Sequence, residues 1–257
     1  MRQPRKLKEL KTYSLQAHDG EIGKVQEVYF DDAQWSVRYL VVRTGGWLLG
    51  REVLIAPAAI TGLDEENQRI SVDLTCEMVE KSPPVESETP VSRHYETAYH
   101  RYYGWEPYWV GGRPGTEPEL PRLLPAPPEF PGEPEHPHLR SSEEIRGYGI
   151  RARDGDIGQV EDFIVDDGNW KILYLKIDTG KWLPGKKVLV APAWIERIDW
   201  AAREITVDLE RETIESAPPY DASQVIGHDD EVKLYAHYGK SRTEEDESDS
   251  ASAKTTP

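Results

Sequence analysis

The chain contains one stretch of sequence twice, as HDGEIGKVQEVYFDDAQWSVRYLVVRTGGWLLGREVLIAPAAI over His18–Ile60 and as RDGDIGQVEDFIVDDGNWKILYLKIDTGKWLPGKKVLVAPAWI over Arg153–Ile195. The two copies align without a gap when the numbering is shifted by 135. Between residues 13–84 and 148–219, 32 of 72 positions are identical. This period is longer than the roughly 20–50 residues of a solenoid unit. The sequence therefore predicts a duplicated small domain.

Length and charge limit the class of protein. The 257 residues leave roughly 90 for each copy, which is enough for one modest core. The formal net charge is −16, and an acidic surface repels phosphates, so no nucleic-acid partner is expected. The N-terminal run MRQPRKLKELK is an exception, which we interpret as a basic, solvated end of the chain rather than as an RNA-binding arm.

Cysteine usage and hydropathy indicate the compartment. A single cysteine, Cys76, excludes an internal disulfide framework. Its counterpart in the second copy is Arg211, so we expect Cys76 to face solvent. The N-terminus has no apolar signal-peptide core, and no run approaches the ~20 apolar residues of a membrane span. We therefore expect a cytoplasmic protein without a membrane span.

Each copy consists of short β-rich runs separated by turn residues. Asp19-Gly20 and Asp31-Asp32 mark turns. The run from Val25 to Phe30 has one residue too many for strict alternation, which indicates a β-bulge. The expected strands of the first copy are Lys11–Leu15, Val25–Phe30, Trp35–Gly45, Glu52–Ile55 and Arg69–Leu74. Five or six such strands in roughly 60 residues predict a mainly β fold of two tandem small β-barrels, closed or nearly closed.

Short helices are expected after each barrel. Thr75–Lys81 and Glu210–Ser216 are helix-forming stretches that stop at double prolines. A second helical stretch carries tyrosines at helical spacing, namely Tyr95, Tyr99 and Tyr102 or Tyr103. Its partner in the second copy is Val232–Tyr238. Aromatic residues at this spacing are typical of packing against a barrel or of a dimer interface.

The predicted boundaries are 1–104 for the first barrel with its helices, 105–140 for a linker, 141–239 for the second barrel with its helices, and 240–257 for a tail. Residues 106–138 hold ten of the twenty prolines, which predicts a semi-extended linker. Three aromatic residues near its start are expected to dock back onto a barrel: Trp105, Tyr108 and Trp109. The acidic, Ser-rich tail is expected to be disordered.

The repeated run DGEIGKVQEVYFDD…W…YLVV…TG…VLIAP, closing on Pro-Pro, resembles the PRC-barrel family, and the second copy resembles it more closely still. The resemblance covers about two thirds of the chain and implies small six-stranded β-barrels that dock onto partners. It also implies a bacterial origin. The family includes the cytoplasmic domain of the photosynthetic reaction-centre H subunit, but this chain lacks that subunit's N-terminal membrane helix.

The sequence favours a non-enzymatic adaptor that presents two tethered barrels to protein partners, because duplication with a proline-rich tether raises effective concentration. One alternative is an accessory component, like the H subunit, of a photosynthetic or electron-transfer complex. Another is a metal-dependent hydrolase that uses the aspartate pairs Asp31-Asp32 and Asp166-Asp167, although such pairs more often shape turns. No metal-ligand or cofactor-binding spacing occurs, so no metal or cofactor is expected.

Large aromatic side chains are the expected contact residues, because they give a large contact area at low entropic cost. Four are selected as partner-binding: Trp47 and Trp182 on matching hairpin arms, and Tyr103 and Tyr238 on the second helices. The partner protein is not identified by the sequence, and a homodimer is possible. The two barrels either pack as a pseudo-twofold pair or exchange partners between chains, since the long linker allows both.

Overall fold

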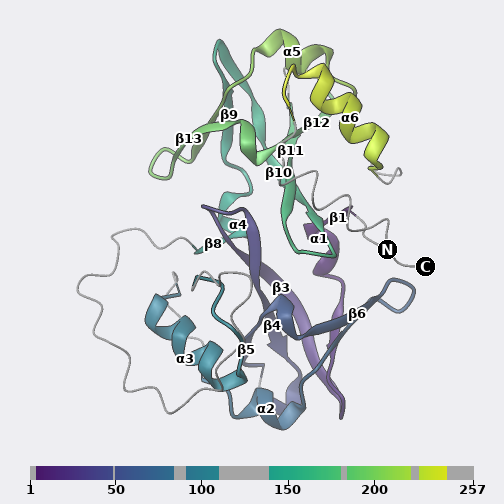
Figure 1. Cartoon of the computed structure of the whole chain (residues 1–257), viewed down its shortest axis with the longest axis vertical. Coiled ribbons are helices and arrows are strands. Elements are labelled where there is room, and N and C mark those ends of the chain that lie inside the picture. The colour runs from purple at the N-terminus through teal and green to yellow at the C-terminus, as the bar shows by residue number, and fades with distance from the viewer. Residues whose placement is uncertain are drawn as a thin grey trace, which may run out of the picture.

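The computed structural model describes residues 4–48, 50–83, 91–109, 139–180, 184–220 and 226–241. These residues form a mainly β structure of two seven-stranded sheets with short helices. The two sheets lie one above the other along the long axis of the molecule (Figure 1). We call residues 4–109 the first half and residues 139–241 the second half.

The first sheet has the strand order β5-β4-β3-β2-β7-β6, with β8 attached to β3. Its strands are β2 (Ser14–Gln16), β3 (Glu21–Asp31), β4 (Ser36–Thr44), β5 (Glu52–Ile55), β6 (Ile60–Asp64), β7 (Arg69–Val72) and β8 (Leu139–Ser141). The second sheet has the order β12-β11-β10-β9-β14-β13, with β1 attached to β10. Its strands are β1 (Pro4–Lys6), β9 (Gly149–Ala152), β10 (Gly155–Asp166), β11 (Ile172–Asp178), β12 (Lys187–Val190), β13 (Ile195–Asp199) and β14 (Glu204–Val207).

Among the described residues, neither sheet closes into a barrel by hydrogen bonds, which excludes the fully closed one of the two forms expected from the sequence, closed or nearly closed. Each sheet ends on two strands, β5 and β6 or β12 and β13, that follow each other in the chain but do not pair. The turns between them are the 3-10 helices η2 (Pro57–Ala59) and η3 (Pro192–Trp194). Proline at the first position has no N–H to donate and its fixed φ bends the chain, so no ladder continues across this corner.

The expected bulge is present in both long strands. The register of β3 against β4 shifts between Val25 and Glu27, and that of β10 against β11 shifts between Val160 and Asp162. Gly23, just before the bulge, lies against the backbone of β4: an added Cβ would be 2.0 Å from the carbonyl oxygen of Arg43. A glycine at this position is therefore required by the close approach of two strands.

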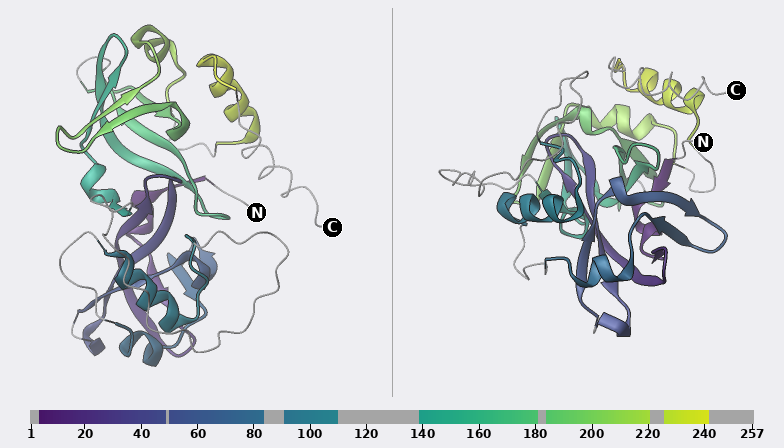
Figure 2. Two further views of the ribbon diagram at one scale, coloured as in Figure 1. Left: turned by 60° about the vertical axis from the view of Figure 1, so that its left-hand side comes forward. Right: turned by 60° about the horizontal axis from the view of Figure 1, so that its bottom comes forward.

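The helices are α1 (Leu7–Leu10), η1 (Gly46–Leu48), α2 (Cys76–Glu80), α3 (Arg93–Tyr103), α4 (Ser142–Ile145), α5 (Arg211–Ser216) and α6 (His228–His237). Helices α2 and α5 end shortly before the expected double prolines. The hydroxyl of Thr75 caps α2 by accepting from Met78 N, and Ser92 caps α3 in the same way. Gly104 ends α3 with a left-handed φ of 71°. Figure 2 shows α3 against the first sheet and α6 against the second.

The two halves exchange their first strands. β1 pairs with β10 of the second half through Pro4↔Asp166, Arg5↔Val165 and Lys6↔Ile164. β8 pairs with β3 of the first half through the residues 135 positions along, Leu139↔Asp31, Arg140↔Phe30 and Ser141↔Tyr29. The short helices that follow each strand go with it, so α1 lies on β10 and α4 on β3 (Figure 1). The halves are thus interlocked by a reciprocal exchange.

An arginine locks each exchanged strand. Arg5 Nε donates to Asp167 of the second half at 2.7 Å, and Arg140 Nε donates to Asp32 of the first half at 2.8 Å. Arg5 also pairs with Glu65 at 2.5 Å. The sequence interpretation of the basic N-terminus as a solvated end is therefore wrong for Arg5, whose side chain is 14% exposed. The carboxylates of Asp167 and Glu65 offset the cost of removing the guanidinium from water, because they neutralise its charge.

The contact surface between the two halves, which we call the seam, has a second reciprocal contact at its centre. Val37 N donates to Trp170 O at 2.8 Å, and Ile172 N donates to Trp35 O at 2.7 Å. Buried side chains of both halves form one continuous hydrophobic cluster, with ring centroids of Phe30 and Phe163 5.5 Å apart. The two copies therefore pack as a pseudo-twofold pair with a shared core rather than as two separate barrels on a tether. The linker range 105–140 includes Leu139 and Arg140, which belong to β8.

Replacing Gly23 by alanine is expected to destabilise the fold, because its Cβ would meet backbone that cannot move aside. The expected loss is about 2–3 kcal/mol in the free energy of unfolding, measured by urea denaturation. Gly62→Ala is the control, since nothing lies within 4 Å of an added Cβ there. Equal stability of the two variants would contradict this account of the close approach.

Cutting the chain between the halves is expected to leave them associated, because the exchanged strands and the shared core do not depend on the connection. A protease site inserted between residues 110 and 138 would be cut in the folded protein, and the product followed by size-exclusion chromatography at micromolar concentration. We expect both fragments to elute together at the volume of the uncut chain. Elution as two separate species would contradict the interlocked arrangement.

Candidate docking face

The outer face of the first sheet is covered by α3. A second hydrophobic cluster lies between them, made of Tyr29, Tyr39, Val41, Leu54, Ala56, Val91, Tyr95, Tyr99 and Leu139. The hydroxyl of Tyr99 donates to Leu54 O at 2.5 Å and accepts from Leu54 N at 3.0 Å. These bonds satisfy the outer edge of β5, which would otherwise remain free to pair with another strand.

A polar cluster is buried under α3. The hydroxyl of Tyr39 lies 2.7 Å from His100 Nε2 and 3.1 Å from Glu96 Oε1. Glu96 is 2% exposed and His100 4% exposed. Arg93 pairs with the other oxygen of Glu96 at 3.0 Å, so the carboxylate has partners on both sides. Burial raises the pKa values of Glu96 and Tyr39 and lowers the pKa of His100, because each charged form loses its hydration.

The residues after α3 close this cluster, as the sequence predicts for its aromatic members. Tyr108 donates its hydroxyl to Glu96 Oε1 at 2.7 Å. Trp109 packs edge-on against His100 with centroids 4.9 Å apart, and Trp105 stacks on Tyr103 at 4.3 Å. His100 Nδ1 lies 3.2 Å from Glu106 O. A carbonyl only accepts, so Nδ1 carries a proton. The cluster fastens residues 105–109 to α3.

A pocket of about 390 Å³ opens beside the hydrophobic cluster under α3, at the seam between the halves. The first half contributes Glu27, Tyr29 and Val91 to its lining. The second half contributes Leu139, Arg140, Ser141 and Glu144. The pocket is therefore formed only when β8 and α4 are docked on β3.

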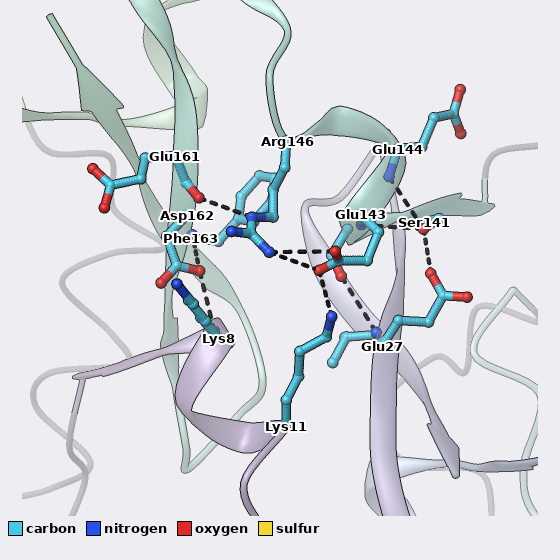
Figure 3. A network of polar contacts seen from close by, with 12 residues as sticks. Lys8, Lys11, Glu27, Ser141, Glu143, Glu144, Arg146, Glu161, Asp162 and Phe163 are labelled. Atoms are coloured by element: carbon cyan, nitrogen blue, oxygen red, sulfur yellow. Dashed lines mark hydrogen bonds and ion pairs between the residues drawn. The ribbon is translucent and has the colours of Figure 1, made fainter. Parts of the chain in front are cut away.

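The field in this pocket is negative. Glu27 accepts a hydrogen bond from Ser141 Oγ, and burial raises the pKa of its carboxyl group, with the charges of Glu143 and Glu52 adding to the effect. Figure 3 shows Ser141 joined to the Glu27 carboxylate and to the backbone N–H of Glu144, whose side chain points away from Glu27. The Glu144 carboxylate accepts from the Tyr148 hydroxyl at 3.1 Å. The Arg140 guanidinium is committed elsewhere, to Asp32 and to the ring of Trp200 at 3.7 Å.

The other side of the network in Figure 3 joins the halves. Lys11 pairs with Glu143 at 2.9 Å, and Arg146 pairs with the same carboxylate at 3.0 Å. Asp162 accepts from the backbone N–H of Lys8, the first turn of α1, at 3.1 Å and from that of Phe163 at 2.9 Å. Because Asp162 is 3% exposed, these bonds offset the cost of burying its carboxylate.

The four aromatic residues selected from the sequence do not gather in one place. Tyr103 is half-buried between Tyr99 and Trp105. Tyr238 is 5% exposed and packs on Trp194 at 4.7 Å, which leaves it little surface for a partner. Trp47 lies in η1, where the structure describes the backbone alone, and Trp182 lies outside the described residues.

The aspartate pairs shape turns and hold the seam. Asp31 Oδ1 accepts from Ala33 N at 2.8 Å, and Asp166 Oδ1 accepts from Gly168 N at 2.8 Å. The second aspartate of each pair, Asp32 or Asp167, binds the arginine of the exchanged strand. Among the residues that the structure describes, no group of three or more His, Cys, Asp or Glu side chains has the geometry to hold a metal ion.

The residues that build the pocket and the seam were missed by sequence reasoning, although a signal for them exists. The offset of 135 continues upstream of the repeat as first delimited, relating PRKLKELK (residues 4–11) to LRSSEEIR (residues 139–146). Arg5 and Arg140 coincide in this extension, as do Glu9 and Glu144. The offset also extends downstream, where Tyr102 donates to Met78 O and the equivalent His237 contacts Thr213 O.

The buried imidazole predicts a loss of stability in mild acid. The folded pKa of His100 is lowered, so between pH 7 and 5 the unfolded chain binds a proton that the folded protein does not. The free energy of unfolding then falls by up to about 1.4 kcal/mol per pH unit. Glu96, with its raised pKa, acts in the opposite sense, because its folded form takes up a proton more readily as pH falls.

Urea denaturation at pH 7, 6 and 5 would separate the two contributions. We expect His100→Gln, whose amide group can still bond to the Tyr39 hydroxyl but does not titrate, to show a smaller decline than the parent protein. His18→Gln is the matched control, because His18 is 60% exposed and lies on the surface. A decline as steep in His100→Gln as in the parent would contradict the proposed origin of the pH dependence.

Within the described residues, no helix is long and apolar enough to cross a membrane. A search of curated proteins gives no match for this chain. The family model described as the PRC-barrel domain matches residues 6–78 and, a second time, residues 138–214. The first match begins at the last residue of β1 and ends in α2, and the second begins just before β8 and ends in α5, so the duplicated unit of the sequence is the unit of the family. The chain therefore belongs to the PRC-barrel domain family, of which it carries two copies.

Proposed function

We propose that this chain is a non-enzymatic docking protein that binds a protein partner at the seam pocket of its first half. The observation that carries the proposal is the composite lining of that pocket, to which both halves contribute side chains. A binding site that exists only in the interlocked form gives the duplication a purpose that one copy alone cannot serve.

The interlocked seam changes the form of the adaptor hypothesis. Two independently tethered barrels would act through effective concentration. Here the halves share one core and exchange strands, so they present their surfaces at fixed positions. We therefore propose one rigid docking face instead of two flexible ones. A cytoplasmic location and a homodimer remain predictions from the sequence.

The engagement of the polar groups supports a docking role. Glu96, His100 and Tyr39 are bonded to one another and covered by residues 105–109, so they are shielded from any substrate. Asp32 and Asp167, the carboxylates considered for a hydrolase, serve the arginines of the seam. The pocket, by contrast, is open and combines an apolar floor with an acidic rim, which suits the side chain of a protein partner.

A photo-crosslinking amino acid placed at Gln26, an exposed position next to Glu27, would test the docking face in the cells that produce the protein. Glu66, exposed in the β6–β7 turn, is the control position. We expect a discrete adduct with another protein from position 26 and none from position 66. The same adducts from both positions, or none from either, would contradict a docking face at the pocket.

A further inference from the structure

The seam pocket has a counterpart in the other half, because residues 135 positions apart occupy equivalent places in the two sheets. Glu27 corresponds to Asp162, and Glu144 corresponds to Glu9. Both places therefore hold two carboxylates at the joint between an exchanged segment and a long strand. The duplication thus provides an internal comparison of one site in two versions.

In the second half, this place is filled by the protein's own lysines. Lys6 of β1 pairs with Glu9 at 2.9 Å, and its ammonium group is also attracted by the charge of Asp162. Lys176 stands directly opposite Asp162 in the β10–β11 ladder. Lys187 on the next strand pairs with Glu161 at 2.9 Å. Lys6 thus serves Glu9 and Asp162, whereas Lys176 and Lys187 both pair with the neighbouring Glu161.

In the first half, none of these cations is present. Ser141, Val41 and Glu52 stand at the positions of Lys6, Lys176 and Lys187. Val41 is the residue opposite Glu27 in the β3–β4 ladder, and Glu52 adds a further negative charge beside it. Within the described parts of the chain, neither Glu27 nor Glu144 forms an ion pair. The first half keeps carboxylates at the places of Asp162 and Glu9 and has none of the three lysines, while Gln26 stands at the place of Glu161, the carboxylate that Lys176 and Lys187 bind.

The shape of the pocket matches the missing side chain. In the second half, this place is occupied by the side chain of Lys6 from the exchanged strand, which is 21% exposed. In the first half the shorter Ser141 leaves an opening of about 390 Å³ at the same place. Tyr29, Val91 and Leu139 supply apolar surface for a hydrocarbon stem, and each is less than 9% exposed. A lysine combines such a stem with a terminal cation.

We infer that the pocket at the seam, lined by Glu27 and Glu144, receives a lysine side chain of the partner protein. This inference rests on the proposed docking function and names the group that the docking face recognises. The net charge of −16 favours the approach of a basic segment of the partner. The aliphatic stem lies on the apolar floor, and the ammonium group takes the place that Lys6 fills in the other half.

The test uses the full chain, labelled with ¹⁵N, and Nα-acetyl-lysine methylamide as the probe. We expect saturable shifts of the amide signals of Val91 and Ser141, with weak affinity, because a single side chain makes few contacts. Nα-acetyl-norleucine methylamide, which has the stem without the charge, is expected to give no saturable shift. Equal responses to the two probes would overturn the inference. A response to cadaverine as strong as that to the lysine probe would assign the pocket to free amines instead.

Substitutions distinguish the pocket from general acidity. Glu27→Gln and Glu144→Gln are each expected to weaken binding of the lysine probe at least tenfold, whereas Glu196→Gln, exposed on β13, is expected to leave it unchanged. Ser141→Lys restores the side chain found at the equivalent position and is expected to abolish probe binding by filling the pocket. Undiminished binding to Ser141→Lys, with amide signals elsewhere unchanged, would overturn the inference.

Failure of this inference is separable from failure of the proposed function. A crosslinked partner at position 26 together with no response to the lysine probe would overturn lysine recognition and leave the docking face in place. A lysine response without any crosslinked protein would contradict docking of a protein partner and, with it, the source assigned to the lysine.

Discussion

The last residues of the two long strands have a backbone edge that no strand of their own half reaches. β2 covers β3 only at residues 21–24, and β9 covers β10 only at residues 155–159. Residues 29–31 and 164–166 would otherwise expose unpaired N–H and C=O groups, which cost free energy when buried and invite aggregation when exposed. The first strand of the opposite half covers each edge. The exchange, the arginine locks and the composite pocket all follow from this constraint.

The reciprocal geometry explains why the aspartate pairs are so alike in the two copies. The first aspartate of each pair satisfies backbone donors within its turn, as Asx turns do. The second aspartate then has its carboxylate directed across the seam, where Arg140 or Arg5 meets it. A partly buried arginine with charged and planar partners on both sides is held more firmly than a surface ion pair. These turns are therefore structural elements of the interface between halves.

The duplication preserved the frame and allowed the charges at one joint to diverge. Residues that set turns, bulges and close approaches recur at both places, as Gly23 and Gly158 do, because the backbone leaves no alternative there. The side chains near the joint differ between the copies: lysines stand in the second half where Ser141, Val41 and Glu52 stand in the first. Val41 is buried under α3, so its place suits an apolar side chain. An intramolecular pair of copies can divide its roles in this way, since one copy can remain sealed while the other stays open.

The sequence by itself determined the duplicated unit, the family, the bulged long strands and the helices stopped by prolines. These features depend on local spacing and turn chemistry, which both copies repeat. Only the tertiary structure decided that the β1 and β8 segments cross to the opposite half and that Glu27 lies in an open pocket beside Ser141 and Glu144. A strand of three residues carries no pattern that names its partner, and two equal copies offer it two equivalent edges. Which edge the strand pairs with depends on how far the edge lies from it in the folded chain and on the core that the two halves share. Neither can be read from the order of residues.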